Sequence, residues 1–311
     1  MNLSDIDLRL LEMFIAVVES RGVANAQTLL NRDASTISRQ LRQLEDKLEL
    51  RLCERGRRGF QLTPDGEKIF RYTLALKQAV QTFEDRTESL KGHLSGQVRL
   101  AIIDNLITDP NCPLRAVLAL YGARSKNKTH LHLEIMSPPR IEHALLDHQA
   151  DLGIGIFPSH LPELQYEPMY EETDWLVCAP SNALAGAESP EQVHSTLQSC
   201  SKVARNSLGA QGTRHLGGSD SNVTAWVANL EAEALLILAG THVGFLPSHY
   251  ARNWIESGQM VAVRPDYFRR KSLVEAAFRP GRETQKSAVT AFLEDLFSTL
   301  SLHGERASHV R

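Results

Sequence analysis

The segment DASTISRQLRQLE (residues 33–45) carries serine and arginine side chains at helical spacing. At about 100° per residue, Ser35, Arg39 and Arg42 project to one side of a helix and Ser38 lies on its flank. Serine hydroxyls are short hydrogen-bond donors, and a guanidinium can hold a phosphate or a guanine edge through two parallel bonds. The segment therefore predicts a helix with a polar face suited to such anionic or base-edge acceptors.

Apolar residues on the other side of this helix fix its orientation. Ile37, Leu41, Leu44 and Leu48 are spaced four, three and four residues apart and form a narrow inward stripe. Two shorter helical patterns precede it, at residues 8–18 and 26–30. Two helices joined by a short turn, the second bearing serine and arginine outward, form a helix-turn-helix layout. The basic, glycine-flanked segment that follows, RGRRGFQL, is typical of a small hairpin wing.

One long helix is expected next. Thr63 is a suitable N-cap, Pro64 suits the first helical position, and Asp65 places an anion in the first turn. Apolar residues and two threonines then step by four and three, as in a coiled-coil seam: Ile69, Thr73, Leu76, Val80, Phe83, Thr87 and Leu90. The pattern favours a dimerisation helix, and an amphipathic helix lying on its own domain is the alternative. The helix should end near Gly92, with a hinge-like break at 95–96.

Strand and helix patterns alternate through the remaining chain. Strands are expected at 98–103, 132–136, 152–156, 175–179, 243–246 and 273–278, and helices at 113–123, 140–148, 191–198, 231–239 and 287–300. Such alternation argues for an α/β fold with a mostly parallel sheet and helices on both faces. The last nine residues offer no core and are expected to fray.

Composition sets broad limits on the class of protein. At 311 residues the chain has room for about two domains of roughly 150 residues. The net charge of -3 excludes a globally basic nucleic-acid binder, and the arginine-rich octapeptide at 51–58 is only a local patch. No apolar run approaches the ~20 residues of a membrane span, and the N-terminus is not a signal peptide. Four distant cysteines suggest reduced thiols, so a cytoplasmic protein without a membrane partner is expected.

Enzyme motifs are missing from the sequence. The twelve histidines form no HExxH pattern and no metal-ligand cluster with cysteine, and there is no GxSxG elbow. The glycine-rich segment at 217–221 lacks the lysine of a phosphate loop. We therefore expect no catalytic residue, no cofactor and no metal site. A solute-binding module or enzyme whose N-terminal helices only dimerise remains the rival interpretation.

The N-terminal motifs resemble LysR-type transcriptional regulators. The resemblance rests on FxAVVE at 14–19, AxxLL at 26–30, STISRQLxxLE at 35–45, LCER at 52–55 and LTPxG at 62–66, without a gap. Weaker similarity continues in GxVRL at 96–100, ADLGIG at 150–155 and GTHVGFLP at 240–247, so that about residues 8–300 are covered. Cys53 stands where the family commonly has Phe and is expected to be a small buried side chain.

This resemblance implies a domain organisation. It comprises a winged helix-turn-helix at 1–66, a linker coiled coil at 67–92, and an effector-binding domain at 97–311 built like periplasmic solute-binding proteins. Lobe I would be about 97–168 plus 272–300, and lobe II about 169–271. Such regulators usually assemble as dimers of dimers on an interrupted DNA dyad near a promoter, with a small effector between the lobes. A homodimer or homotetramer is expected, with RNA polymerase open as a further partner.

The resemblance places the polar helix face in a DNA major groove. Arg39 would read guanine or clamp a phosphate, and serines near the helix N-terminus would reach phosphate or base edges. The family commonly carries Gln where this chain has Ala34, which can make only an apolar contact, for example with a thymine methyl. The expected DNA-binding residues are Ala34, Ser35, Ser38, Arg39, Arg42, Arg55, Arg57 and Arg58, the last three on the wing.

Polar residues that follow strands are the candidates for the effector site, because ligands of such folds lie at the carboxyl ends of strands. Arg205 is a candidate carboxylate clamp, and Asp104 suggests an amine or hydroxyl on the ligand or a pair with Arg205. Loop capping, a surface ion pair and a helix N-cap are the structural alternatives. The full expected set is Asp104, Asn105, Ser137, Arg205, Asn206, Ser248 and His249.

Overall fold

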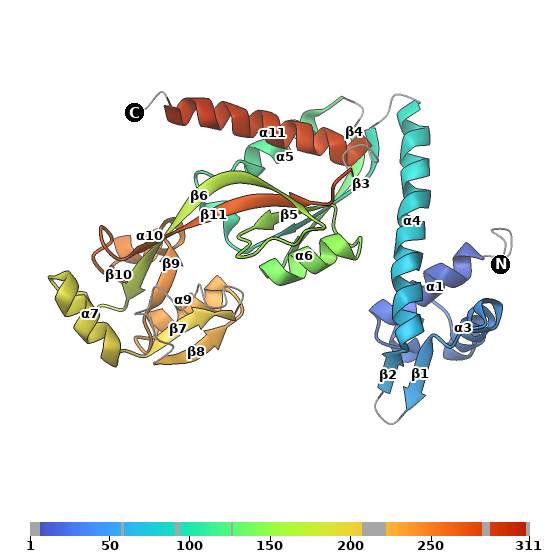
Figure 1. Ribbon diagram of the computed structural model, residues 1–311, viewed down its shortest axis with the longest axis horizontal. Coiled ribbons are helices and arrows are strands. Elements are labelled where there is room, and N and C mark those ends of the chain that lie inside the picture. The colour runs from blue at the N-terminus through green and yellow to red at the C-terminus, as the bar shows by residue number, and fades with distance from the viewer. Residues whose placement is uncertain are drawn as a thin grey trace. The chain divides into compact units, whose positions relative to one another are not determined.

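The chain forms two compact units, Met1–Glu84 and Asp85–Arg311, in a computed structural model (Figure 1). The structure describes residues 7–56, 59–90, 94–125, 127–206, 222–281 and 287–308. None of the helices within these ranges is long and apolar enough to cross a membrane.

The first unit is a helix-turn-helix followed by a hairpin, as the sequence predicts. Its elements are α1 (Leu8–Glu19), α2 (Val23–Leu30), α3 (Ala34–Leu48), β1 (Cys53–Gly56) and β2 (Gly59–Leu62). The apolar stripe of α3 is buried, with Ile37, Leu41 and Leu44 packed against Phe14 and other residues of α1. Cys53 is buried in the same core, as expected for a small apolar side chain.

The long helix α4 (Pro64–Leu90) begins where the sequence predicts. The Thr63 hydroxyl accepts a hydrogen bond from the Gly66 amide at 2.9 Å and so caps the helix. The seam is divided: Ile69 and Leu76 pack against the core of the first unit, whereas Phe83 and Leu90 are 72% and 90% exposed. The first half of α4 therefore follows the alternative interpretation, an amphipathic helix that lies on its own domain.

A mixed sheet organises the second unit. Within the described residues, seven strands join it: β3 (Leu94–Ile102), β4 (Asn127–Ile135), β5 (Leu152–Gly155), β6 (Gln165–Cys178), β9 (Gly244–Pro247), β10 (Val261–Ala262) and β11 (Arg269–Phe278). Among the described strand pairs of this sheet, only β3–β4 and β3–β5 are parallel. The strands β6 and β11 run antiparallel over ten residue pairs, and β9 and β10 pair antiparallel with β6. The prediction of a mostly parallel sheet was wrong, because two long crossing strands join the lobes.

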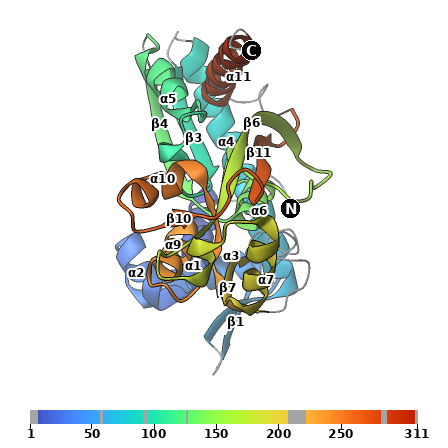
Figure 2. The same cartoon turned by 90° about the vertical axis from the view of Figure 1, so that its left-hand side faces the viewer.

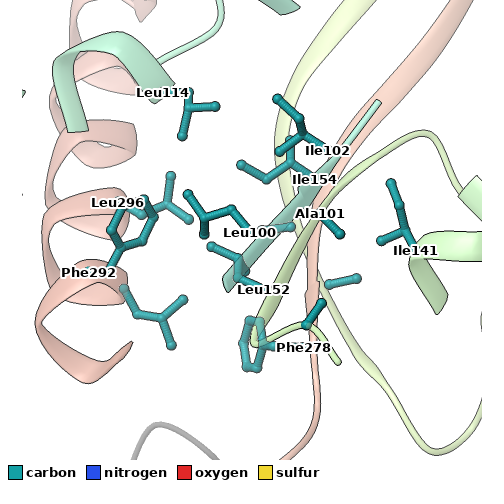
Figure 3. Close-up of a cluster of buried hydrophobic side chains, with 14 of the residues drawn as sticks. Leu100, Ala101, Ile102, Leu114, Ile141, Leu152, Ile154, Phe278, Phe292 and Leu296 are labelled. Atoms are coloured by element: carbon teal, nitrogen blue, oxygen red, sulfur yellow. The ribbon is translucent and has the colours of Figure 1, made fainter. Parts of the chain in front are cut away.

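The first lobe contains the larger core. Helices α5 (Leu114–Ala123) and α11 (Ser287–Ser308) contribute to it, as does α6 (Pro138–Leu146). Figure 3 shows Leu100 of β3 directed toward Phe292 and Leu296 of α11, while Ile141 of α6 lies on the other side of the strand. Helices thus cover both faces of this part of the sheet.

The second lobe surrounds the far ends of β6 and β11. It contains η3 (Ala183–Gly186), α7 (Pro190–Ser199), β7 (Lys202–Arg205), β8 (Val223–Val227), α9 (Leu230–Leu238) and α10 (Ser248–Glu256). The strands β7 and β8 pair in parallel, and two apolar clusters fill the lobe. Both views place α5 and α11 at one end of this unit and α7 and β7 at the other (Figure 2).

Two smaller expectations were wrong. Residues 95–96 do not break the chain, because they lie inside β3 and pair with Lys128 and Thr129. The C-terminal tail continues α11 as far as Ser308, although the sequence offered it no core. An established helix can extend through polar residues without a core, since each added residue forms one more backbone hydrogen bond.

Candidate functional site

The N-terminus of α3 is closed by Asp33. One carboxylate oxygen, Oδ1, accepts a hydrogen bond from the Thr36 amide at 2.8 Å, and the Thr36 hydroxyl donates to Oδ2 at 2.8 Å. The Ser35 hydroxyl also donates to Oδ1. The bond from Ser35, followed by those from Thr36, holds the pKa of Asp33 well below its usual range. The proton of Ser35 is therefore already used within the protein.

The polar face of α3 is accessible. Ser35, Arg39 and Arg42 are exposed, and Ala34 and Ser38 are half-buried. The Ala34 amide donates to Oε1 of Gln27 on α2 at 3.2 Å, and the Arg32 guanidinium donates to Oε1 of Gln40 at 3.0 Å. These bonds fix the turn between the two helices, so the predicted residues of α3 are presented together.

The hairpin is attached to α3 through Glu45. Its Oε1 accepts hydrogen bonds from the amides of Leu52 at 2.7 Å and Cys53 at 3.2 Å. The strands pair from Cys53 opposite Leu62 to Gly56 opposite Gly59. The backbone of Arg55 lies in β1; its side chain, and both Arg57 and Arg58, lie outside the described residues.

A cleft of about 300 Å³ lies between the lobes of the second unit. Three of the seven residues predicted for the effector site line it, namely Asp104, Ser137 and Arg205. The lining also includes Glu172 of β6 and the N-terminal turn of α9. Arg140 on α6 also lines the cleft; it is exposed and was not among the residues predicted from the sequence.

Asp104 joins the two lobes. Its Oδ2 accepts a hydrogen bond at 2.7 Å from the amide of Leu230, the first residue of α9. A carboxylate at this position also opposes the positive end of the helix dipole. Asp104 is therefore a cap supplied by one lobe to a helix of the other, and it forms no ion pair with Arg205 in the structure.

Arg205 lies in a buried ion network and not in a surface pair. Its Nη2 is 3.1 Å from Oδ2 of Asp174, and its Nε is 3.1 Å from Oε2 of Glu233. Arg270 also donates to Oδ2 of Asp174. Burial acts to lower the pKa of Arg205, but Glu233 and Asp174 raise it on balance. Because two carboxylates already hold this guanidinium, Arg140 is better placed to take an anionic ligand.

The four remaining predicted residues do not line the cleft. Asn105 has a left-handed backbone with φ 70°, and its Nδ2 is buried without a hydrogen-bond partner among the described residues. Asn206 is exposed, and Ser248 is the half-buried first residue of α10. The His249 side chain is turned into a buried cluster with Glu172.

Comparison with protein families accounts for both units. The model "Bacterial regulatory helix-turn-helix protein, lysR family" matches residues 8–67, and "LysR substrate binding domain" matches residues 91–300. The chain belongs to the LysR family of transcriptional regulators. Members of this family are regulators and not enzymes, and the resemblance seen in the sequence motifs is confirmed.

Individual relatives agree with this assignment. The HTH-type transcriptional activator BauR of Pseudomonas aeruginosa is 33% identical over 282 residues, which cover 90% of this chain and 91% of BauR. The RuBisCO operon transcriptional regulator of Allochromatium vinosum is 28% identical over 181 residues, 58% of each chain. The crystal structure of CbnR, a LysR family transcriptional regulator, is 19% identical, with a TM-score of 0.65, and the match covers 95% of this chain and 99% of CbnR. That likeness supports the fold of this LysR-family protein.

Proposed function

We propose that this LysR-family regulator binds an interrupted dyad in double-stranded DNA near promoters and responds to a small polar effector in its interlobe cleft. The observation that carries the proposal is the accessible face of α3, where Arg39 and Arg42 are exposed on a helix anchored by a buried apolar stripe. A helix fixed in this way can enter a major groove with its guanidinium groups toward base edges and phosphates.

Each side chain of the face has a distinct chemical capacity. Arg39 offers a bidentate fork to guanine, and Ala34 offers an apolar contact to a thymine methyl. Ser38 and Arg42 would face the phosphates that flank the groove, and Arg55, Arg57 and Arg58 on the wing would contact the backbone or the minor groove. Ser35 acts as an acceptor unless its hydroxyl turns away from Asp33. Donation from the Ser35 hydroxyl to DNA would therefore cost its hydrogen bond to Asp33.

The cleft favours a small ligand with an anionic group. Its volume of about 300 Å³ is at the lower end for ligand pockets. Arg140 is exposed and enters no ion pair among the described residues, whereas Arg205 is paired with two carboxylates. Ser137 precedes Arg140 at the start of α6, and its side chain forms no cap hydrogen bond. We assign Arg140 and Ser137 as anion contacts, with Asp104 and Glu172 facing any amine or hydroxyl; Asn105, Asn206, Ser248 and His249 stay predictions.

Exposed apolar side chains support a homodimer or homotetramer. Phe83 and Leu90 are exposed on the second half of α4, and the outer strand β4 exposes Leu131, Leu133 and Ile135. Association with a second copy would bury both surfaces and remove their apolar area from water. A regulator of this kind would act in the cytoplasm beside RNA polymerase at its promoters.

The proposal is tested by genome-wide fragment selection with the purified protein at a stated salt concentration, followed by sequencing. Enrichment of an interrupted dyad is expected. Arg39→Ala should weaken this enrichment and relax the preference at one base pair, while Arg115→Ala, which removes an exposed arginine on α5, should leave it unchanged. Salt-labile binding without sequence preference would contradict the proposal. The second unit would then be the functional part, in line with the rival solute-binding interpretation.

A further inference from the structure

Three side chains that are distant in sequence meet in a buried cluster beside the cleft. Asp109 follows the short helix η2 (Leu106–Thr108) in the first lobe, Glu172 lies on the crossing strand β6, and His249 lies on α10 in the second lobe. One ligand atom from each lies within 4.8 Å of the other two. His249 Nε2 is 3.1 Å from Oε1 of Glu172 and 3.4 Å from Oδ2 of Asp109.

The cluster contains an acceptor that the protein does not satisfy. Oδ1 of Asp109 accepts a hydrogen bond from the Asn111 amide at 2.8 Å, but the buried Oδ2 has no hydrogen-bond partner among the described residues. The side chains of Asp109, Glu172 and His249 are 1%, 5% and 7% exposed. Two buried carboxylates are costly unless a positive charge lies between them. The arrangement therefore calls for a cation at the point where these atoms converge.

The histidine is oriented to present Nε2 to that point. Its Nδ1 is 2.8 Å from the Thr108 hydroxyl, which also lies 3.1 Å from Oδ1 and 3.3 Å from the backbone carbonyl of Asn105. When Nε2 binds a cation, the ring proton lies on Nδ1, so Nδ1 donates to the Thr108 hydroxyl and Thr108 donates its own proton to Asn105. With its proton on Nδ1, a neutral His249 presents the Nε2 lone pair to the two carboxylates. Metal-binding histidines are held by such a bond from their other ring nitrogen.

We propose that Asp109, Glu172 and His249 bind a divalent transition-metal cation of the Zn²⁺ class. Zinc lies roughly 2.0–2.2 Å from imidazole nitrogen and carboxylate oxygen, so adjacent ligands of a tetrahedral site are roughly 3.3 Å apart. The two histidine–carboxylate separations, 3.1 and 3.4 Å, fit this spacing, and all three ligand atoms lie within 4.8 Å of one another. A dication would neutralise both carboxylates, and the imidazole favours the transition metals over Mg²⁺ or Ca²⁺.

The position of the site gives the cation a structural consequence. It would join a loop of the first lobe, a crossing strand and a helix of the second lobe through one centre. Glu172 also lines the cleft, so the same carboxylate would connect the ion with the cleft wall. Binding of the cation should therefore stabilise the second unit with its lobes together, whatever the effector is.

The test is calorimetric titration of Zn²⁺ into the chelator-treated full chain without DNA. One equivalent should bind per chain, and thermal unfolding should shift to higher temperature. Asp109→Asn keeps the oxygen that accepts from Asn111 and changes only the unsatisfied one, and it should weaken Zn²⁺ binding at least about tenfold. His249→Gln and Glu172→Gln should do the same, and Mg²⁺ should not compete.

The matched control is His160→Gln. His160 also pairs with a carboxylate, Glu275, at 3.0 Å, but its ring is half-exposed and has no second acid in the ion pair. This variant should bind Zn²⁺ like the unaltered protein. Circular dichroism checks that each variant is folded, and Asp109→Asn is the decisive one if His249→Gln does not fold. Absence of stoichiometric Zn²⁺ binding, or unchanged affinity in folded Asp109→Asn, would overturn the proposal. The fragment selection is independent of either result.

Discussion

Asp33 shows how one residue limits what its neighbours can do. Its carboxylate caps α3 by accepting a hydrogen bond from the Thr36 amide. The hydrogen bond from Ser35 was not foreseen, because any of several rotamers of a serine two residues away is compatible with the sequence. Since the Ser35 proton is bound internally, the guanidinium groups of Arg39 and Arg42 are the main donors that α3 can offer.

Replacing Arg39 with alanine should weaken specific DNA binding by about 1–3 kcal/mol and relax the preference at one base pair. The physical reason is the loss of a bidentate donor from an exposed helix face. Binding measured against single-base variants of the selected site, at fixed salt, gives both quantities. An equal loss on every sequence would make Arg39 a phosphate contact, and Arg115→Ala is the control for a general change in charge.

At the scale of elements, Gly66 holds α4 against the loop before β1. A Cβ at this position would lie 2.0 Å from the carbonyl oxygen of Leu52, which also accepts the Thr63 amide at 3.0 Å. Gly66→Ala should therefore destabilise the first unit by about 1–3 kcal/mol, as measured by urea unfolding. Gly122→Ala is the control. A Cβ at this helical glycine would meet no atom within 4 Å. This variant should be neutral or stabilise by roughly 0.5–1 kcal/mol; a loss as large as that of Gly66→Ala would contradict the argument.

The second half of α4, where Phe83 and Leu90 are exposed, should mediate association. The double variant Val80→Glu with Phe83→Glu is expected to weaken dimerisation while the first unit stays folded, because it places two charges in an apolar seam. Val80 also lines a groove with Leu8 and Leu11, so the double variant loses local packing as well. Phe83→Glu alone, at a 72% exposed position, separates the two effects. An unchanged molecular mass in sedimentation would contradict the dimer seam. Arg71→Glu is the control, because Arg71 lies about 120° around the helix from Phe83.

Local patterns predicted the elements better than their pairing. The stripe of α3, the Thr63 cap and the hairpin follow from neighbours in sequence, and all three are confirmed. The antiparallel pairing of β6 with β11 joins residues about a hundred positions apart, such as Glu171 and Leu273, and no local pattern encodes it. The ADLGIG motif was recognised, but only the structure shows that the Asp151 carboxylate pairs with Arg99 at 3.0 Å.

The candidate site in the cleft shows the same limit. Rules for the ends of strands placed Asp104, Ser137 and Arg205 at its wall. They could not supply the partners, because the Asp104 bond to Leu230 spans 126 residues. The cluster of Asp109, Glu172 and His249 has no short spacing that a motif search could detect. These contacts appear only when both lobes and their crossing strands are assembled.

At the scale of the whole molecule, the second unit depends on charges buried in its second lobe, beside the cleft. Arg205, Asp174, Glu233 and Arg270 form a network with two positive and two negative side chains. It is adjacent to the Asp104 cap, so the joint between the lobes is polar rather than apolar. A polar joint makes the stability of this unit sensitive to the protonation of its acids.

Glu233 should make that stability fall as the pH rises toward neutrality. Burial, opposed by Arg205 and Arg270 and assisted by Asp174 and Asp104, raises the pKa of Glu233 from its usual value of 4.5 to about 7. Between these values the folded state holds a proton that the unfolded state has lost, so this contribution is fully present below about pH 4.5 and is lost as the pH rises through 7. Urea unfolding from pH 5 to 8 should show the free energy of unfolding declining more steeply for the unaltered protein than for Glu233→Gln, which cannot titrate. Glu231→Gln, exposed on the same helix, should follow the unaltered protein. A difference between the Glu233→Gln and unaltered curves that stays constant with pH would show that Glu233 is ionised throughout and held so by Arg205.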